Sequence, residues 1–286
     1  MPEQTMSDAD ASASLHSILV AADGSPHSRA AIDAAVRIAA TVEASVDGLF
    51  VEDDTLLRTA RLPGAREVRA CTAPPRRLGD ARLTRQLRHQ ARAAERALGR
   101  LAGRADVAYG FETVAGSVSE ELRRAARNAD LLVLGKTSTD SSRRRLGSTS
   151  ATLLRDAPCS VLVLRRPIPP REPLLLYYDG SAAAETALGL ALRLVHRAPD
   201  SPLEVLLPAH DGADAGALRN RVQARTDGLA IPFRLNPLPP SQSRRVPTIA
   251  RQNKGLFVLP ERAPPLRSGS LQALLYDLDR PLLVAR

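Results

Sequence analysis

Residues 17–39 read SILVAADGSPHSRAAIDAAVRIA, and residues 173–195 read PLLLYYDGSAAAETALGLALRLV. The two stretches align without a gap. Each begins with an apolar run typical of a buried strand, passes through an Asp-Gly-Ser turn and continues with apolar residues at helical spacing. A strand, turn and helix that occur twice in one chain predict two domains of the same topology.

Matching segments near the end of each half extend this repeat. DLLVLG at 130–135 corresponds to GLFVLP at 255–260. GSTSATLLRDAPCSVLVLR at 147–165 corresponds to GSLQALLYDLDRPLLVAR at 269–286 with a one-residue adjustment. Both halves are therefore expected to finish with a strand, a polar segment, a helix and a last strand.

The proline-rich segment RRPIPPREP at 165–173 separates the two halves. Such a segment is typical of a domain boundary. We predict a disordered leader at 1–16, an N-terminal domain at 17–166 and a degenerate C-terminal domain at 173–286. The leader lacks the basic start and apolar stretch of a signal peptide, so a cytoplasmic protein is expected.

Apolar runs and helical patterns alternate through both halves. In the first half the pattern predicts strands at 17–22, 45–51, 106–114, 131–135 and 159–165, helices at 26–42, 80–102, 117–128 and 148–156, and an irregular insertion at 52–79. In the second half it predicts strands at 174–178, 203–208, 231–236, 255–259 and 281–285 and helices at 182–197, 213–226, 245–253 and 270–278. This alternation predicts α/β domains whose parallel sheets are covered on both faces.

Composition excludes a membrane-spanning protein and favours no metal site. Hydrophobic residues make up 44% and charged residues 25% of the chain, and no apolar stretch approaches the roughly 18–20 residues of a membrane span. Cys71 and Cys159 stand in no metal-ligand spacing, and neither do the five histidines. Cys159 begins the apolar run CSVLVL, so we expect it to be a buried, reduced thiol.

Thirteen arginines gather between residues 58 and 104, against three acidic residues. The helix at 80–102 has apolar residues at helical spacing, so its arginines are expected on the opposite side. The apolar set is Leu83, Leu87, Ala91, Ala94, Leu98 and Leu101. Because aromatic residues total only 3%, no stacking platform for bases accompanies the charge. We expect a solvated helix face and neither a nucleic-acid nor a membrane partner; contact with an acidic partner or a membrane surface is the alternative.

A ligand site is predicted where two strands of the first half end. In an open parallel sheet, ligands bind beyond the carboxyl ends of the strands, where the strand order reverses. This rule selects the turn Asp23, Gly24 and Ser25 after the first strand and the segment 135–149 after the fourth. Capping of the helix that follows is the alternative role for Asp23.

The segment 135–149 has features of a phosphate-binding loop. Gly135 lets the backbone come close to a ligand, and Gly147, Ser148 and Thr149 present N–H groups and hydroxyls at a helix N-terminus, which attracts anions. Helix capping by Ser148 is the structural alternative.

Basic residues accompany this segment. Lys136 and the three consecutive residues Arg143, Arg144 and Arg145 would favour a polyphosphate through charge-assisted hydrogen bonds. A solvated basic loop is the alternative.

Four motifs in this order resemble the universal stress protein family, and the doubled arrangement resembles its tandem two-domain members. They are ILVAADGSPHS, VAGSVSEEL, ADLLVLGK and LGSTSATLLRDAPCSVLVLR. The resemblance implies, for each half, a doubly wound, Rossmann-like five-stranded parallel sheet of order 3-2-1-4-5. Because domains of this family pair through their last strands, it also implies a pseudo-dimer of the two halves, and a homodimer of two chains stays open.

In one branch of the family, ATP is held by the glycine motif G-x2-G-x9-G-[S/T]. Carried over to this chain, the first glycine is Gly135 and the closing pair is Gly147 and Ser148. Ser138 stands in place of the middle glycine, and eight residues instead of nine separate it from Gly147. A serine there costs about 1 kcal/mol where the backbone is left-handed.

The same resemblance places Asp23 beside the nucleotide and Val51, at the end of the second strand, near the base. It implies ATP, with or without Mg²⁺, as the ligand of the first half. In the second half Pro260 replaces the first glycine, and the following ERAPPLR lacks several N–H donors because proline has none. We expect no nucleotide there.

Three functions follow as hypotheses. The first is a stress-response protein that binds ATP or another adenine nucleotide in its N-terminal domain and acts as a sensor or regulator. It is not expected to be an efficient enzyme, because no nucleophile is paired with a general base and no Walker-type lysine follows the glycines. The second is a stress-induced interaction protein that uses the arginine-rich segment 58–104 as its contact. The third, a nucleotide hydrolase or adenylyl transferase, would need a histidine phosphate motif, for which His27 is the candidate.

Overall fold

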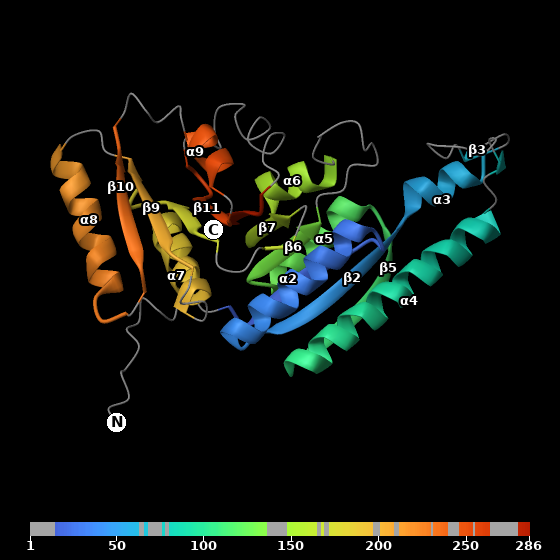
Figure 1. Ribbon diagram of the computed structural model, residues 1–286. Helices are drawn as coiled ribbons and strands as arrows, with labels where there is room; N and C mark the ends of the chain where they lie inside the picture. Colours follow the sequence, from blue (N-terminus) through green and yellow to red (C-terminus); the bar gives the residue numbers. More distant parts are fainter. Residues whose placement is uncertain are drawn as a thin grey trace.

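Ten strands form one continuous sheet that runs through both halves of the chain (Figure 1). In this computed structural model the strand order is β10-β9-β8-β11-β12-β7-β6-β1-β2-β5. The structure describes residues 15–62, 66–67, 76–77, 80–135, 148–164, 167–168, 172–196, 201–208, 212–229, 231–239, 246–253, 255–263 and 280–286. The predicted leader, apart from residues 15 and 16, and the predicted helix at 270–278 lie outside these ranges.

Each half contributes five parallel strands in the same order. The first half has β1 (Ser17–Ala22), β2 (Ser45–Asp53), β5 (Tyr109–Gly116), β6 (Leu131–Gly135) and β7 (Ser160–Leu164). The second half has β8 (Leu174–Tyr177), β9 (Leu203–Pro208), β10 (Phe233–Leu238), β11 (Phe257–Pro260) and β12 (Leu282–Ala285). Numbered within its own half, each set has the order 3-2-1-4-5. The predicted fold class is therefore confirmed.

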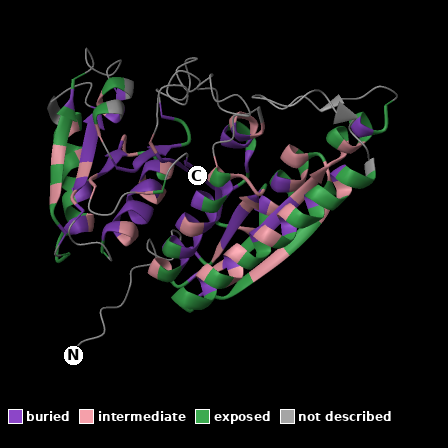
Figure 2. Cartoon of the chain, turned by 45° about the vertical axis from the view of Figure 1, so that its right-hand side comes forward, coloured by how far each residue is buried: buried purple, intermediate pink, exposed green. Residues whose placement is uncertain are grey.

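Helices cover both faces of the sheet. One face carries α2 (Pro26–Val42), α4 (Asp80–Ala105), α7 (Ala182–His196) and α8 (Gly212–Thr226). The other carries α5 (Val118–Ala125), a 3₁₀ turn (Ala126–Asn128), α6 (Ser148–Asp156) and α9 (Val246–Gln252). Buried residues gather on the strands and on the inner sides of the helices (Figure 2). No helix within the described ranges combines the length and apolarity needed to cross a membrane.

The two halves meet at their last strands. β7 and β12 pair antiparallel, with Leu162 opposite Leu283, and both side chains are almost completely buried. Helices α2 and α7 pack against each other across the same junction. The edges that β7 and β12 would otherwise expose are thereby closed by hydrogen bonds.

The insertion between β2 and α4 is more ordered than its composition indicates. Residues predicted to be irregular include α3 (Asp54–Ala60) and a two-stranded ribbon of β3 (Arg66–Glu67) and β4 (Arg76–Arg77). The side chain of Asp53 accepts a hydrogen bond of 2.8 Å from the backbone N–H of Thr55 and caps α3. The prediction of a wholly irregular segment is therefore wrong, because a single capping carboxylate is a weak signal for a seven-residue helix.

Other predicted boundaries shift by a few residues. α4 continues to Ala105, and Leu101 is half-buried where a core position was expected, while Leu98 is completely buried. β5 begins at Tyr109 and extends to Gly116. In the second half β10 includes Pro237, which is tolerated because β10 is an edge strand.

Candidate functional site

A pocket of about 110 Å³ opens at the carboxyl ends of β1, β2 and β6, beside the start of α6. It is lined by Ala21, Ala22, Asp23, Ser28, Leu49, Val51, Val118, Leu122, Leu134, Gly135, Thr149 and Ser150. Four of these are predicted site residues, namely Asp23, Val51, Gly135 and Thr149. The fold therefore brings together positions that are up to 126 residues apart in the sequence.

The other predicted residues divide into two groups. Gly24 and Ser25 belong to the turn beside the pocket but do not line it. Ser148 is the first residue of α6. The remaining predicted residues, Lys136, Ser138, Arg145 and Gly147, lie outside the described part of the chain, as does the side chain of Ser148.

The Asp-Gly-Ser turn holds the start of α2. Asp23 Oδ1 accepts a hydrogen bond of 2.8 Å from the N–H of Ser25, and Ser25 Oγ accepts one of 3.0 Å from the N–H of Ser28. The capping residue is thus Ser25 and not Asp23. Gly24 has a φ of 74°, a left-handed conformation that favours glycine.

The second half builds the same turn. Asp179 Oδ1 accepts the N–H of Ser181 at 3.1 Å, and Ser181 Oγ accepts the N–H of Ala184 at 3.2 Å. Gly180 has a φ of 75°. The turn starts a helix in both halves, so its presence by itself is no evidence for a ligand.

Two of the pocket positions carry different residues in the second half. Tyr177 occupies the place of Ala21, since it pairs with Leu206 as Ala21 pairs with Leu49. Tyr177 is only 2% exposed and belongs to the core on the α9 face. Pro260 matches Gly135, because each lies two residues beyond the valine that pairs with the first strand of its half. A buried aromatic side chain thus stands where the first half has an alanine at the pocket.

Gly135 is required by close packing. A Cβ added to Gly135 would lie 2.7 Å from the backbone carbon and oxygen of His27 and 2.9 Å from the N atom of Ser28. The end of β6 therefore lies directly against the first turn of α2 and forms part of the pocket wall. His27, on which phosphate-transfer chemistry would depend, does not line this pocket.

Several lining residues were not predicted from the sequence. Ser28 is 2% exposed, and its Oγ accepts the N–H of Asp23 at 3.2 Å. Val118 and Leu122 reach the pocket from α5. The only signal for Ser28 is its position three residues after the cap, and Val118 and Leu122 look like ordinary core residues in the sequence.

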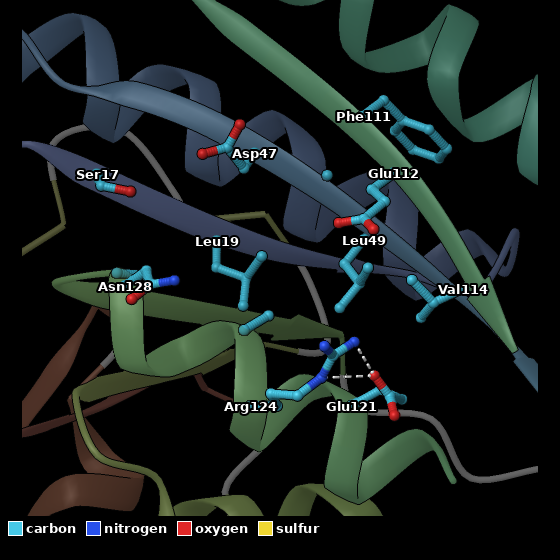
Figure 3. A pocket seen from close by; sticks show the side chains of 13 residues that line it. Ser17, Leu19, Asp47, Leu49, Phe111, Glu112, Val114, Glu121, Arg124 and Asn128 are labelled. Atoms are coloured by element: carbon cyan, nitrogen blue, oxygen red, sulfur yellow. Dashed lines mark hydrogen bonds and ion pairs between the residues drawn. The ribbon is translucent and has the colours of Figure 1, made fainter. Parts of the chain in front are cut away.

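A larger pocket of about 360 Å³ lies farther along the same sheet face, between α5 and the strands β2 and β5 (Figure 3). Its polar lining includes three carboxylates, from Asp47, Glu112 and Glu121, and one cation, Arg124. Arg124 Nε donates to Glu121 Oε2 at 3.0 Å, so this charge is already paired. A pocket with this excess of negative charge disfavours a polyphosphate.

Cys159 is a structural thiol. Its side chain is 8% exposed, and burial raises the pKa of the thiol to about 11, although the nearby Arg286 guanidinium counteracts part of this rise. The thiolate is the reactive form, so the group is inert near neutral pH. Within the described ranges, no group of three or more His, Cys, Asp or Glu residues is arranged to hold a metal ion.

We predict that Gly135→Ala destabilises the protein by about 1–3 kcal/mol, because β6 must move away from the backbone of α2. Gly103→Ala is the matched control: it is exposed in α4, its Cβ would meet nothing within 4 Å, and it should stabilise the helix by about 0.5–1 kcal/mol. Urea denaturation followed by circular dichroism measures both. Equal midpoints for the two variants would contradict the close approach.

A second prediction concerns Cys159 in a Cys71→Ser variant, in which it is the remaining thiol. The native protein should react negligibly with a water-soluble disulfide reagent near neutral pH and increasingly as the pH rises toward about 11, because the thiolate fraction grows tenfold per pH unit below the pKa. Denatured protein is the positive control. Rapid native labelling near neutral pH would show that the thiol is accessible and ionised.

Comparisons with known proteins agree with this architecture. The sequence profile described as the universal stress protein family matches residues 15–165. A universal stress protein from Archaeoglobus fulgidus has a similar structure, with a TM-score of 0.68 at 15% identity, covering 94% of this chain and 98% of that chain. A putative universal stress protein from Pseudomonas aeruginosa is similar with a TM-score of 0.55 at 15% identity, over 96% of this chain and 94% of that chain.

A universal stress protein in complex with cAMP resembles part of the chain, with a TM-score of 0.38 at 23% identity, covering 53% of this chain and 98% of that chain. No curated protein matches the sequence. The family profile spans more than half of the 286 residues, and the first-half sheet follows the order implied by the four motifs. The chain belongs to the universal stress protein family.

Proposed function

We propose that the first half binds an adenine nucleotide in the pocket at the ends of β1, β2 and β6, and that the protein acts as a sensor or regulator in a stress response. ATP, with Mg²⁺, is the first candidate. The observation that carries this proposal is the convergence of Asp23, Val51, Gly135 and Thr149 on one pocket. Membership of the universal stress protein family supports it.

The lining suits different parts of a nucleotide. Leu49, Val51, Val118 and Leu122 offer apolar surface for a base. The N-terminus of α6 and the hydroxyl of Thr149 suit a phosphate, because the first N–H groups of a helix have no partner within it. The pocket is smaller than the roughly 300–1,000 Å³ of typical small-molecule sites, so a bound nucleotide would extend beyond it.

The carboxylate of Asp23 is the described acidic group at the pocket. It is exposed, although one of its oxygens accepts the N–H of Ser25. Magnesium is commonly held through one or two carboxylates and the phosphates of a nucleotide, so Asp23 fits this role better than a dedicated metal cage would. When bound, Mg²⁺ would neutralise phosphate charge.

A regulatory role fits the lining better than efficient catalysis. Ser28 carries a hydroxyl at the pocket, but its oxygen already accepts the N–H of Asp23 and its N–H is bonded to Ser25. The described lining contains no histidine or lysine that could act as its base. We therefore propose that any ATP turnover is slow and that binding itself is the signal.

The test is to purify the protein, denature it and analyse the released nucleotide by chromatography, and in parallel to measure the thermal shift with Mg-ATP. Binding of the folded state alone should stabilise it by about 2.7 kcal/mol at a ligand concentration of 100 times Kd. Ala21→Tyr, which copies Tyr177 of the second half, should abolish both signals by filling the pocket. Thr113→Tyr, exposed on β5, is the matched control.

Two outcomes of these measurements would contradict the proposal. Wild-type protein that releases no nucleotide and shows no thermal shift with ATP, ADP, AMP or cAMP does not bind adenine nucleotides. Equal binding by wild type and Ala21→Tyr would place the ligand elsewhere. Replacing Gly147 by a bulky residue tests the loop before α6 in the same assay.

A second candidate function rests on α4, whose outer face carries a line of arginines. The seven residues are Arg82, Arg85, Arg88, Arg92, Arg96, Arg100 and Arg104, all exposed. None of them forms an ion pair with another described residue. The last five stand four residues apart, and each such like-charged pair costs the helix about 0.2–0.5 kcal/mol. An acidic protein partner would remove this repulsion.

We expect the α4 arginine face, defined by these seven residues, to bind acidic polypeptides. A variant with Arg92, Arg96 and Arg100 changed to Gln should lose most of its affinity for labelled polyglutamate at low ionic strength, measured by fluorescence anisotropy. A control with Arg123, Arg127 and Arg262 changed to Gln removes the same charge from exposed positions elsewhere. Equal losses in both variants would indicate net charge alone, and no binding by wild type would refute this function.

A further inference from the structure

Arg286 reaches from the second half into the first. It follows β12, and its guanidinium lies against the end of α6. Nη2 donates to the carbonyl oxygens of Leu154 at 2.7 Å and Arg155 at 3.2 Å, and Nη1 donates to the carbonyl oxygen of Cys159 at 3.0 Å. The side chain is 10% exposed. An arginine from one half thus caps a helix of the other.

These contacts satisfy groups that α6 cannot satisfy by itself. The last carbonyls of a helix have no partner within the helix, and a positive charge at this end also interacts favourably with the helix dipole. Charge-assisted hydrogen bonds are about twice as strong as neutral ones, and Arg286 makes several of them in a largely buried position. Loss of the guanidinium would leave these carbonyls without a donor.

Arg286 also forms hydrogen bonds with Glu261 of the second half and Ser160 of the first half. Arg286 Nε donates to Glu261 Oε1 at 3.4 Å, and the Glu261 N–H donates to the carbonyl oxygen of Ala285 at 2.8 Å. The backbone N–H of Arg286 donates to Ser160 Oγ in β7 at 3.2 Å. Glu261 follows Pro260, so it belongs to the segment that corresponds to the phosphate segment of the first half. That segment here holds the arginine.

The other end of α6 lies at the proposed nucleotide pocket. Thr149 and Ser150, in its first turn, line the pocket, and Ser150 is only 4% exposed. The helix has nine residues and is therefore about 13 Å long. Leu153 and Leu154 anchor it in the core, and it packs against α5, which also lines the pocket. A helix this short and well packed moves as one body.

We propose that Arg286 is a positioning residue for the nucleotide pocket: through α6, the second half sets the nucleotide affinity of the first half. The inference rests on the proposed function, because it concerns affinity at that site. The second half would then set nucleotide affinity in addition to closing the edge of the first-half sheet.

The test compares wild type with Arg286→Ala, Arg286→Lys and Arg262→Ala in the full chain. Hydrogen exchange of α6 amides, with α2 amides as internal reference, reports the position of the helix whether or not nucleotide binds. Calorimetric titration with Mg-ATP, at a temperature where every variant is folded, reports affinity. Arg262→Ala removes an exposed arginine of the second half that directly follows Glu261 in the sequence.

Arg286→Ala should accelerate exchange in α6, leave α2 unchanged and weaken Mg-ATP binding about tenfold, a usual size for coupling between sites. In both its α6 exchange rate and its Mg-ATP affinity, Arg286→Lys should lie between Arg286→Ala and wild type, because lysine keeps the charge but not the planar set of donors. Arg262→Ala should behave as wild type. If Arg286→Ala does not fold, the lysine variant alone must show both effects.

Two results would overturn the inference while the proposed function stands: unchanged α6 exchange in Arg286→Ala, or faster exchange with unchanged Mg-ATP affinity. Wild-type protein that binds no adenine nucleotide would instead refute the proposed function, and with it the effect on affinity. Exchange that accelerates equally in α6 and α2 would show general destabilisation and would also refute a positioning role.

Discussion

The antiparallel pairing of β7 with β12 is the interaction on which the rest of the structure depends. It converts two five-stranded sheets into one sheet and removes the exposed edge of each last strand. The pairing also brings the residue after β12 to the end of α6, where the Arg286 guanidinium meets three carbonyl groups of the first half. Burial of Leu162 against Leu283 stabilises this arrangement in the hydrophobic layer that the sheet shares with α2 and α7.

The two halves share one topology but differ at the pocket positions. Strand order, the Asp-Gly-Ser turn and the serine cap are the same in both. Ala21 lines the pocket of the first half where the second half has the buried Tyr177, and Gly135 lies against the backbone of α2 where the second half has Pro260. Because the turn is the same in both halves while these residues differ, its conformation serves the fold and is not by itself a sign of a ligand.

Charge is distributed unevenly over this framework. The α4 arginine face is positive, whereas the larger pocket under α5 is lined mainly by carboxylates. The smaller pocket, at the carboxyl ends of β1, β2 and β6, has one exposed carboxylate and an apolar wall. An anionic ligand is therefore better accommodated at the start of α6 than in the larger cavity, although that cavity has more volume.

The sequence by itself determined the alternation of helices and strands and the repeat of the two halves, because apolar periodicity and repeats are local properties. The strand order was implied by the resemblance to the universal stress protein family. The sequence also indicated four lining residues, since they follow strand ends. It did not indicate α3, Ser28 as a lining residue, Leu101 as half-buried or the contact of Arg286 with α6. α3 has one local cap, the Asp53 carboxylate, which is a weak signal in a sequence. The other features depend on which surfaces meet after folding: Ser28 on the approach of Gly135, and Arg286 on the register of β7 with β12, which only the tertiary structure decides.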